Sequence, residues 1–226
     1  MPAPTIDEIE LADEPSRWAE LGFEVEGDTC QIGAVRLRCS GARERAGAEA
    51  ETGAPAPGIV GWSLRDLASP RLDGLPTSIA ERPAPPPAPA QANGVVAIDH
   101  VVAVSPDLDR TVAALQSAGL DLRRIREQPT PAGAPRQAFF RLGAEILELV
   151  QEPDEVIERH GGSDRPAHFW GLALLVSDIE RAAVRFAPHV SEIRDAVQPG
   201  RRIASVRRSA GLSFPLALMS AAGDAR

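Results

Sequence analysis

Two side chains that can transfer protons stand inside apolar segments of the chain. His100 lies in the run VVAIDHVVAV and Glu148 lies in the run EILELV. Alternate residues of a strand project from opposite faces, so Glu148 shares a face with Ile146 and Val150. A buried carboxylate needs a partner. We therefore expect a His100–Glu148 pair in a cavity, where it can act as acid and base in enolisation or epimerisation. The alternative is a hydrogen-bonded core histidine and a carboxylate buried without a catalytic role.

Three further side chains are candidates for substrate binding. Phe139 and Arg141 share one face of the strand-like segment QAFFRL. Arg141 could bind a substrate carboxylate through two parallel hydrogen bonds. Trp170, next to Phe169, could form an aromatic wall for a bulky apolar ligand. The alternatives are a solvated arginine on the strand surface and aromatic side chains that belong to the core.

The composition excludes several kinds of chemistry. The 24 basic residues are all arginine and the chain has no tyrosine. Schiff-base lysines, phosphate-loop lysines and catalytic tyrosines are therefore excluded. The glycine motif of dinucleotide binding, the serine motif of hydrolases and paired CxxC motifs are all missing from the sequence. Cys30 and Cys39 are expected to be free, buried thiols.

Charge and hydropathy predict a cytoplasmic protein. The formal net charge of −8 argues against nucleic-acid binding, which needs a positive surface. The first ten residues carry neither a basic region nor an apolar run, and no segment approaches the roughly 18 apolar residues of a membrane span. We expect a small-molecule ligand or substrate, and no nucleic-acid or membrane partner. The arginine-only usage, with abundant alanine, proline and glycine, indicates a bacterial genome of high GC content.

A proline-rich segment divides the chain into an N-terminal part, residues 1–82, and a C-terminal part, residues 94–220. The segment between them, residues 83–93, begins with PAPPPAPA and should form an extended linker. Residues 40–58 are small and charged and show no periodicity, so we expect a surface loop there.

The C-terminal part repeats one order of elements. The apolar run that holds His100 is followed by a helix and then by the strand segments LRRIRE, QAFFRL and EILELV. The same β-α-β-β-β order returns from FWGLALLV onward, and the helix starts at Asp107 and Asp178 are 71 residues apart. A weaker copy lies in residues 1–82, with strand segments IDEIELA, FEVEGD, TCQIG and AVRLRC and a short helix in PSRWAELG. Such a repeat predicts modules packed about a pseudo-twofold axis.

The segments IDHVVAVSPDLDRTVAALQSAGL and EILELV, together with the repeat, resemble the vicinal oxygen chelate superfamily of glyoxalase/bleomycin-resistance/dioxygenase-like proteins. The resemblance covers residues 95–220 and is weaker in residues 1–82. It implies an α+β fold in which paired βαβββ modules form a curved, cup-shaped sheet. The paired modules would occupy residues 94–220, and residues 1–82 would form a degenerate N-terminal module.

The resemblance also implies a divalent metal in the cup, held by side chains from the first and last strands of the modules. It puts His100 and Glu148 at two such positions. A spacing of 71 residues from His100 leads to Gly171, and the last strand of the second copy has Ala217 where the first has Glu148. Neither Gly171 nor Ala217 can bind a metal through its side chain. His168 should face away from the cup, because an odd shift along a strand reverses the face. The implied metal site is therefore weak or incomplete.

Three functions remain open at this point. The first is a glyoxalase-like enzyme that acts on a small oxygenated metabolite through a divalent metal or the acid–base pair. Lyase, isomerase and dioxygenase reactions are not distinguished. The second is a metal-free protein that sequesters a small molecule without turnover, and the third is a structural or regulatory domain. His100 and Glu148 favour the first, whereas Gly171 and Ala217 favour the second. The cup closes either within one chain or across a homodimer.

Overall fold

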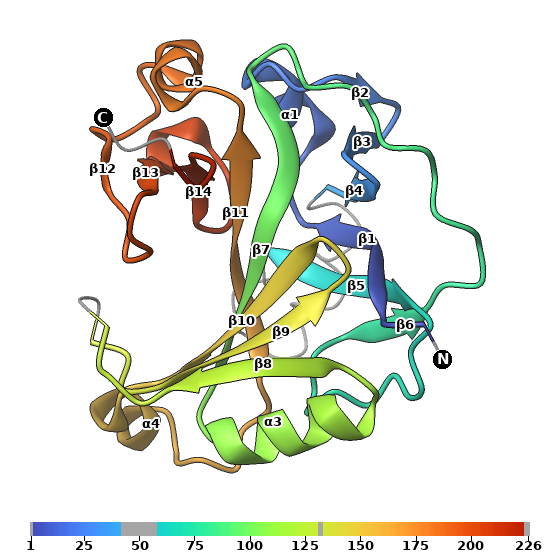
Figure 1. The fold of residues 1–226 in the computed structure, drawn as a ribbon, viewed down its shortest axis with the longest axis vertical. Helices are drawn as coiled ribbons and strands as arrows, with labels where there is room; N and C mark the ends of the chain where they lie inside the picture. Colours follow the sequence, from blue (N-terminus) through green and yellow to red (C-terminus); the bar gives the residue numbers. More distant parts are fainter. Residues whose placement is uncertain (1, 42–57, 131–132, 224–226) are drawn as a thin grey trace. The chain divides into compact units, whose positions relative to one another are not determined.

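A computed structural model describes residues 2–41, 58–130 and 133–223 (Figure 1). The chain forms two compact units, each assembled from several chain segments. Unit 1 comprises the chain up to Asp7, Gly61–Arg82 and His100–Trp170, and unit 2 comprises Glu8–Val60, Pro83–Asp99 and the chain from Gly171 onward. Most of the expected loop at residues 40–58 lies outside the described residues. No helix in the described ranges is long and apolar enough to cross a membrane.

Unit 1 contains one β-α-β-β-β module, which carries the predicted His100 and Glu148. Its elements are β7 (Val95–Ser105, of which the part from His100 belongs to this unit), α3 (Leu108–Ser117), β8 (Asp121–Arg126), β9 (Gln137–Leu142) and β10 (Glu145–Gln151). The helix α4 (Asp154–Arg159) and the start of β11 (His168–Val176) follow. The helix α3 begins where the sequence predicts, because the Asp107 side chain accepts a hydrogen bond from the backbone N–H of Arg110 at 3.0 Å.

The sheet of this module has two different faces. β10 runs parallel to β7, while β9 and β8 continue the sheet in antiparallel pairs. The helix α3 packs along β8, β9 and β10 and buries its apolar residues (Figure 1). The side chains on one face of the sheet form a core and are fully buried: Val101, Ala103, Ala138, Phe140, Leu147 and Leu149. The opposite face, which we call the polar face, carries His100, Gln137, Arg141 and Glu148.

Unit 2 contains elements of two further modules. The N-terminal one consists of β1 (Thr5–Leu11, from Glu8 in this unit), α1 (Pro15–Glu20), β2 (Val25–Glu26), β3 (Thr29–Ile32) and β4 (Val35–Cys39). The C-terminal one consists of the later part of β11, α5 (Ile179–Phe186), β12 (Arg194–Asp195), β13 (Arg202–Val206) and β14 (Leu216–Met219), with a short 3-10 helix at Arg208–Ala210. In unit 1, the strands β5 (Ile59–Arg65, from Gly61 in that unit) and β6 (Thr77–Ile79) pair in parallel at Trp62 and Thr77. Residues 83–93 form neither helix nor strand.

Strand register aligns the three modules residue by residue. In each module the first strand pairs in parallel with the last strand. In each module, we compare the first-strand residue that lies six positions before the first helical residue, together with its partner on the last strand. These pairs are Val102–Glu148, Ala173–Ala217 and Ile9–Leu37. Two residues earlier on the first strand the modules carry His100, Gly171 and Asp7. The predicted α+β fold, its βαβββ order and the 71-residue spacing are confirmed by this register.

Candidate functional site

Three rows of side chains cross the polar face of unit 1. Backbone register gives the rows His100–Ile146–Arg141–Asp121, Val102–Glu148–Phe139–Arg124 and Val104–Val150–Gln137–Arg126. The alternation of the strands therefore brings four residues singled out from the sequence to one face: His100, Phe139, Arg141 and Glu148. This face can present an acid, a base and several arginines to a single small molecule.

His100 and Glu148 meet on this face. His100 Nε2 lies 3.4 Å from Glu148 Oε2, and the two side chains are 17% and 19% exposed. The other carboxylate oxygen, Oε1, accepts a hydrogen bond from Gln137 Nε2. The low exposure strengthens the attraction between imidazole and carboxylate relative to water. The pair has the geometry to hold and pass a proton.

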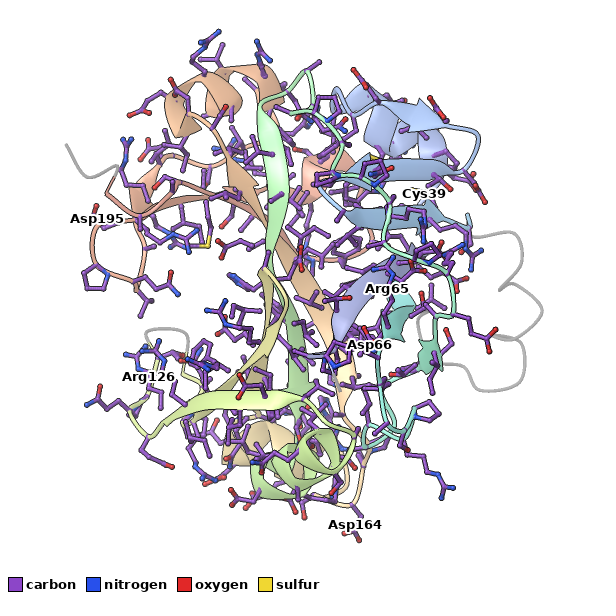
Figure 2. All side chains as sticks on the ribbon, turned by 45° about the vertical axis from the view of Figure 1, so that its right-hand side comes forward. Cys39, Arg65, Asp66, Arg126, Asp164 and Asp195 are labelled. Atoms are coloured by element: carbon purple, nitrogen blue, oxygen red, sulfur yellow. The ribbon has the colours of Figure 1, made fainter. Side chains whose placement is uncertain are left out.

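The aromatic and arginine candidates flank this pair. Phe139 is half-buried, and the guanidinium carbon of Arg124 lies 4.7 Å from its ring centroid. Arg141 is exposed, and among the described residues its guanidinium donates only to the Gly143 carbonyl oxygen, at 3.4 Å. Arg126, labelled at the end of β8 in Figure 2, forms no ion pair with a described carboxylate. Arginines without a fixed carboxylate partner are free to bind an anionic ligand.

Two other predicted positions lie at the start of β11. Trp170 is 50% exposed, and its ring stacks on no other described aromatic side chain. His168 shares its strand face with Trp170 and lies on the face opposite to Gly171, as the odd spacing predicts. Desolvation is the main reason that the pKa of His168 lies below its ordinary value, with nearby Glu152 opposing the shift. The structure does not bring Trp170 or His168 together with Glu148.

The second copy has no room for a ligand side chain at the position of His100. A Cβ atom added to Gly171 would lie 2.5 Å from the carbonyl oxygen of Pro215. The same carbonyl accepts a 3.1 Å hydrogen bond from the Leu172 backbone N–H, so it is held in place. Ala217 pairs with Ala173, as the register requires. At Gly171, therefore, the close approach of two backbone segments leaves no room for a metal-binding side chain.

The N-terminal copy carries a carboxylate at the equivalent position, and two arginines neutralise it. Asp7 is fully buried and forms ion pairs with Arg65 and with Arg82, whose Nε lies 2.7 Å from Oδ2. Ser63 Oγ donates to the same oxygen at 3.1 Å. Figure 2 labels Arg65 on β5, and Arg65 also donates to the Ile6 carbonyl oxygen at 2.9 Å. A carboxylate held by two guanidinium groups is unsuited to bind a cation, so we interpret this cluster as structural.

Sequence reasoning missed Gln137. The residue is 7% exposed and lies two positions before Phe139 on the same strand face. Its Nε2 donates to Glu148, while its Oε1 is buried and has no hydrogen-bond partner among the described residues. The position of Gln137 in QAFFRL, two residues before Phe139, was enough to predict that the two side chains share one face of the strand. The contact itself depends on the pairing of β9 with β10, which the sequence does not specify.

The side chains on this face supply some, but not all, of the ligands that a divalent cation needs. Nitrogen and oxygen ligands bind such ions at about 2.0–2.6 Å, so neighbouring ligands lie roughly 3 Å apart. The 3.4 Å separation of His100 Nε2 and Glu148 Oε2 is close to that spacing. The described part of the chain contains no group of three or more His, Cys, Asp or Glu side chains suited to a metal. Two such ligands hold a cation only weakly unless other donors join them.

A comparison with known protein families identifies a family that matches this chain. The model of the Glyoxalase/Bleomycin resistance protein/Dioxygenase superfamily matches residues 97–209, half of the chain, which include both His100 and Glu148. A comparison with curated proteins gives no match.

One solved structure shares this fold over the whole chain. A xylose isomerase-like TIM barrel/4-hydroxyphenylpyruvate dioxygenase fusion protein is similar over 100% of this chain and 50% of its own, with 14% identity and a TM-score of 0.60. A methylmalonyl-CoA epimerase from Mycobacterium tuberculosis is similar over 57% of this chain and 90% of its own, with 18% identity and a TM-score of 0.46. The chain thus spans half of the fusion protein. By its family match and its repeated βαβββ modules, the chain belongs to the Glyoxalase/Bleomycin resistance protein/Dioxygenase superfamily.

Proposed function

We propose that the polar face of unit 1 is an active site for a small oxygenated metabolite with an acidic C–H bond beside a carbonyl group. The observation that carries the proposal is the 3.4 Å contact between His100 Nε2 and Glu148 Oε2, on a face where both groups are largely buried. A paired imidazole and carboxylate of low exposure can act as acid and base on a bound substrate.

The proposed reaction is a reversible proton transfer. Glu148 removes the proton from the carbon, and the electron pair of the broken C–H bond forms the C=C bond of an enolate. His100, on the same face, stabilises the developing oxyanion by donating a hydrogen bond to it. The protonated Glu148 exchanges its proton with water and returns a solvent-derived proton to the same face of the carbon, which completes hydrogen exchange with retention of configuration. The hydrogen bond from Gln137 Nε2 keeps the carboxylate oriented.

Charge on the polar face supports an anionic substrate. Arg141 is exposed and makes no ion pair with a described residue, so its guanidinium can hold a carboxylate through two hydrogen bonds. Phe139 and Arg124 form a stacked pair in the same row as Glu148, next to the row of Arg141, and Phe139 supplies apolar contact area.

A divalent metal is compatible with the same residues. His100 and Glu148 would hold it, with the spacing given above. Such a cation supplies a Lewis acid that polarises two neighbouring substrate oxygens and stabilises the enolate charge.

A second candidate is binding without turnover. It is favoured by Gly171 and Ala217, which leave the second module without ligands. In this case the arginines and Phe139 would retain an anionic aromatic or apolar compound, and Glu148 would only help to orient it.

Deuterium exchange tests the first function against the second. The full chain is incubated in D₂O with 2-oxobutyrate, 2-oxoglutarate or dihydroxyacetone phosphate, and loss of the proton signal beside the carbonyl is followed by NMR. We expect exchange of at least one probe, reduced about 100-fold or more in Glu148→Gln. Arg123→Gln is the matched control on the exposed edge strand. Exchange of no probe above the protein-free rate, or equal exchange by Glu148→Gln, contradicts the proposal.

A further inference from the structure

The polar face of unit 1 carries more positive than negative charge, although the chain as a whole has a net charge of −8. Arg124, Arg126 and Arg141 lie in its three rows, and none of them forms an ion pair with a described residue. Of the two carboxylates in these rows, Asp121 is already paired with an arginine of its own strand at 3.1 Å, so only Glu148 remains. Uncompensated positive charge on one face of an acidic protein attracts an anionic ligand.

Arg126 has the least complete set of contacts among the three arginines. Arg124 covers the ring of Phe139, and Arg141 is exposed to water. Arg126 is half-buried and makes neither an ion pair nor a side-chain hydrogen bond with a described residue. Gln137, directly across on β9, has a buried Oε1 without a hydrogen-bond partner in the described part of the chain. A guanidinium has five N–H donors, so Arg126 can serve a bound anion and this oxygen together.

The three rows present their groups in the order in which a 2-oxo dicarboxylate carries its own. The first row holds His100 and Arg141, the second holds Glu148, and the third holds Arg126. In the proposed reaction His100 stabilises the enolate oxygen, and Glu148 removes the proton from the next carbon. A carboxylate attached to the carbonyl carbon then lies beside Arg141, in the row of His100. The substrate chain beyond the acidic carbon extends toward Arg126.

We propose that the substrate is a 2-oxo acid with a second carboxylate, which Arg126 binds. The inference rests on the proposed function for the position of the reacting carbon, and it adds the class of substrate. Neighbouring rows are about 7 Å apart along a strand, so the long side chains of Arg126 and Arg141 lean toward the middle row to hold both ends. Each guanidinium can hold one carboxylate through two parallel hydrogen bonds. The distal carboxylate distinguishes this substrate from a simple 2-oxo acid.

Isothermal titration calorimetry of the full chain tests the second carboxylate without any reaction. The ligands are 2-oxoglutarate and 2-oxopentanoate, which have equally long carbon chains and differ in the distal carboxylate. We expect the wild type to bind 2-oxoglutarate about tenfold or more tightly than 2-oxopentanoate. Arg126→Gln should bring this ratio of affinities close to one, whereas Arg126→Lys keeps the charge and should retain part of the preference. Arg141→Gln should weaken the binding of both ligands.

Arg123→Gln is the matched control for the loss of one positive charge. Arg123 is an exposed arginine of the same strand and already pairs with Asp121, so this variant should keep the wild-type ratio. The inference is overturned by a ratio near one in the wild type, by a wild-type ratio in Arg126→Gln, or by no saturable binding of 2-oxoglutarate below about 10 mM. An equal loss of preference in Arg123→Gln also overturns it, because the overall charge of the strand would then explain the preference.

Deuterium exchange separates this inference from the proposed function. A binding preference that depends on Arg126, without exchange of any probe, supports the second carboxylate and contradicts the proton transfer. Exchange of 2-oxopentanoate as fast as that of 2-oxoglutarate, with no preference in binding, overturns the second carboxylate and leaves the proton transfer intact.

Discussion

Replacing Asp7 by asparagine tests whether the N-terminal carboxylate is structural. Asn has nearly the same shape as Asp but carries no charge. Asp7 is fully buried, and Arg65 is 7% exposed. In Asp7→Asn the guanidinium of Arg65 therefore stays buried without its counter-charge. Unit 1 should lose stability, while the polar face with His100 and Glu148 should keep its function.

The burial of the two partners sets the size of the effect. Leaving one member of a buried ion pair without its partner costs about 3–5 kcal/mol. The Arg82 side chain is 51% exposed, so its own pair with Asp7 adds less than about 1 kcal/mol. The free energy of unfolding should fall by about 3–5 kcal/mol. For a chain of this length the Tm should fall by about 6–20 °C.

Urea unfolding followed by circular dichroism measures the change in the free energy of unfolding. Asp121→Asn is the control, because the Asp121–Arg123 pair is exposed and should contribute less than about 1 kcal/mol. Deuterium exchange should be unchanged in Asp7→Asn under conditions where the variant is folded. A loss of stability below about 1 kcal/mol would refute the reasoning on burial. Loss of deuterium exchange in the folded variant would refute the structural role.

Two further substitutions and one labelling experiment have expected outcomes. Gly171→Ala should lower the free energy of unfolding by about 1–3 kcal/mol in urea unfolding, because the new Cβ would lie 2.5 Å from the Pro215 carbonyl oxygen; an unchanged value would contradict this close approach. Burial is the main cause that raises the pKa of Glu145 above 4.5, so the folded state retains this proton longer than the unfolded state as pH rises. The stability of Glu145→Gln relative to the wild type should therefore increase as pH rises above 4.5, and parallel pH curves for the two proteins would contradict the shift. Burial raises the pKa of Cys30 and Cys39 to about 12, so both thiols should resist a disulfide reagent in the folded protein and react after denaturation; fast labelling of the native protein would contradict their burial.

The sequence was sufficient for the part of the site that depends on local periodicity. The alternation in EILELV predicted that Glu148 shares a face with Ile146, and the register shows Ile146 across from His100. The repeated helix starts predicted the equivalence of His100 and Gly171, and the register confirms it. These inferences succeeded because strand period and helix capping are set by neighbouring residues.

The remaining features depend on contacts between distant parts of the chain. The pairing of Asp7 with Arg65 and Arg82 joins residues 58 and 75 positions apart, which no local pattern reveals. The clash that fixes Gly171 arises from Pro215, directly before β14. The repeated β-α-β-β-β order predicts a strand after the second helix, but the exposed charged segment there pairs with β13 only at Arg194–Asp195 and by an isolated bridge from Val190 to Val206. The short strand β6 was not predicted, since its pairing with β5 alone defines it.

The central claim is that His100 and Glu148 act as one unit, and a double-mutant cycle on deuterium exchange tests it most directly. Exchange of the most reactive probe is measured for the wild type, His100→Gln, Glu148→Gln and the double variant. Residues that act together are strongly non-additive, so the double variant should exchange about as slowly as the slower single variant. Independent effects that multiply in the double variant, or single variants as fast as the wild type, would contradict the claim.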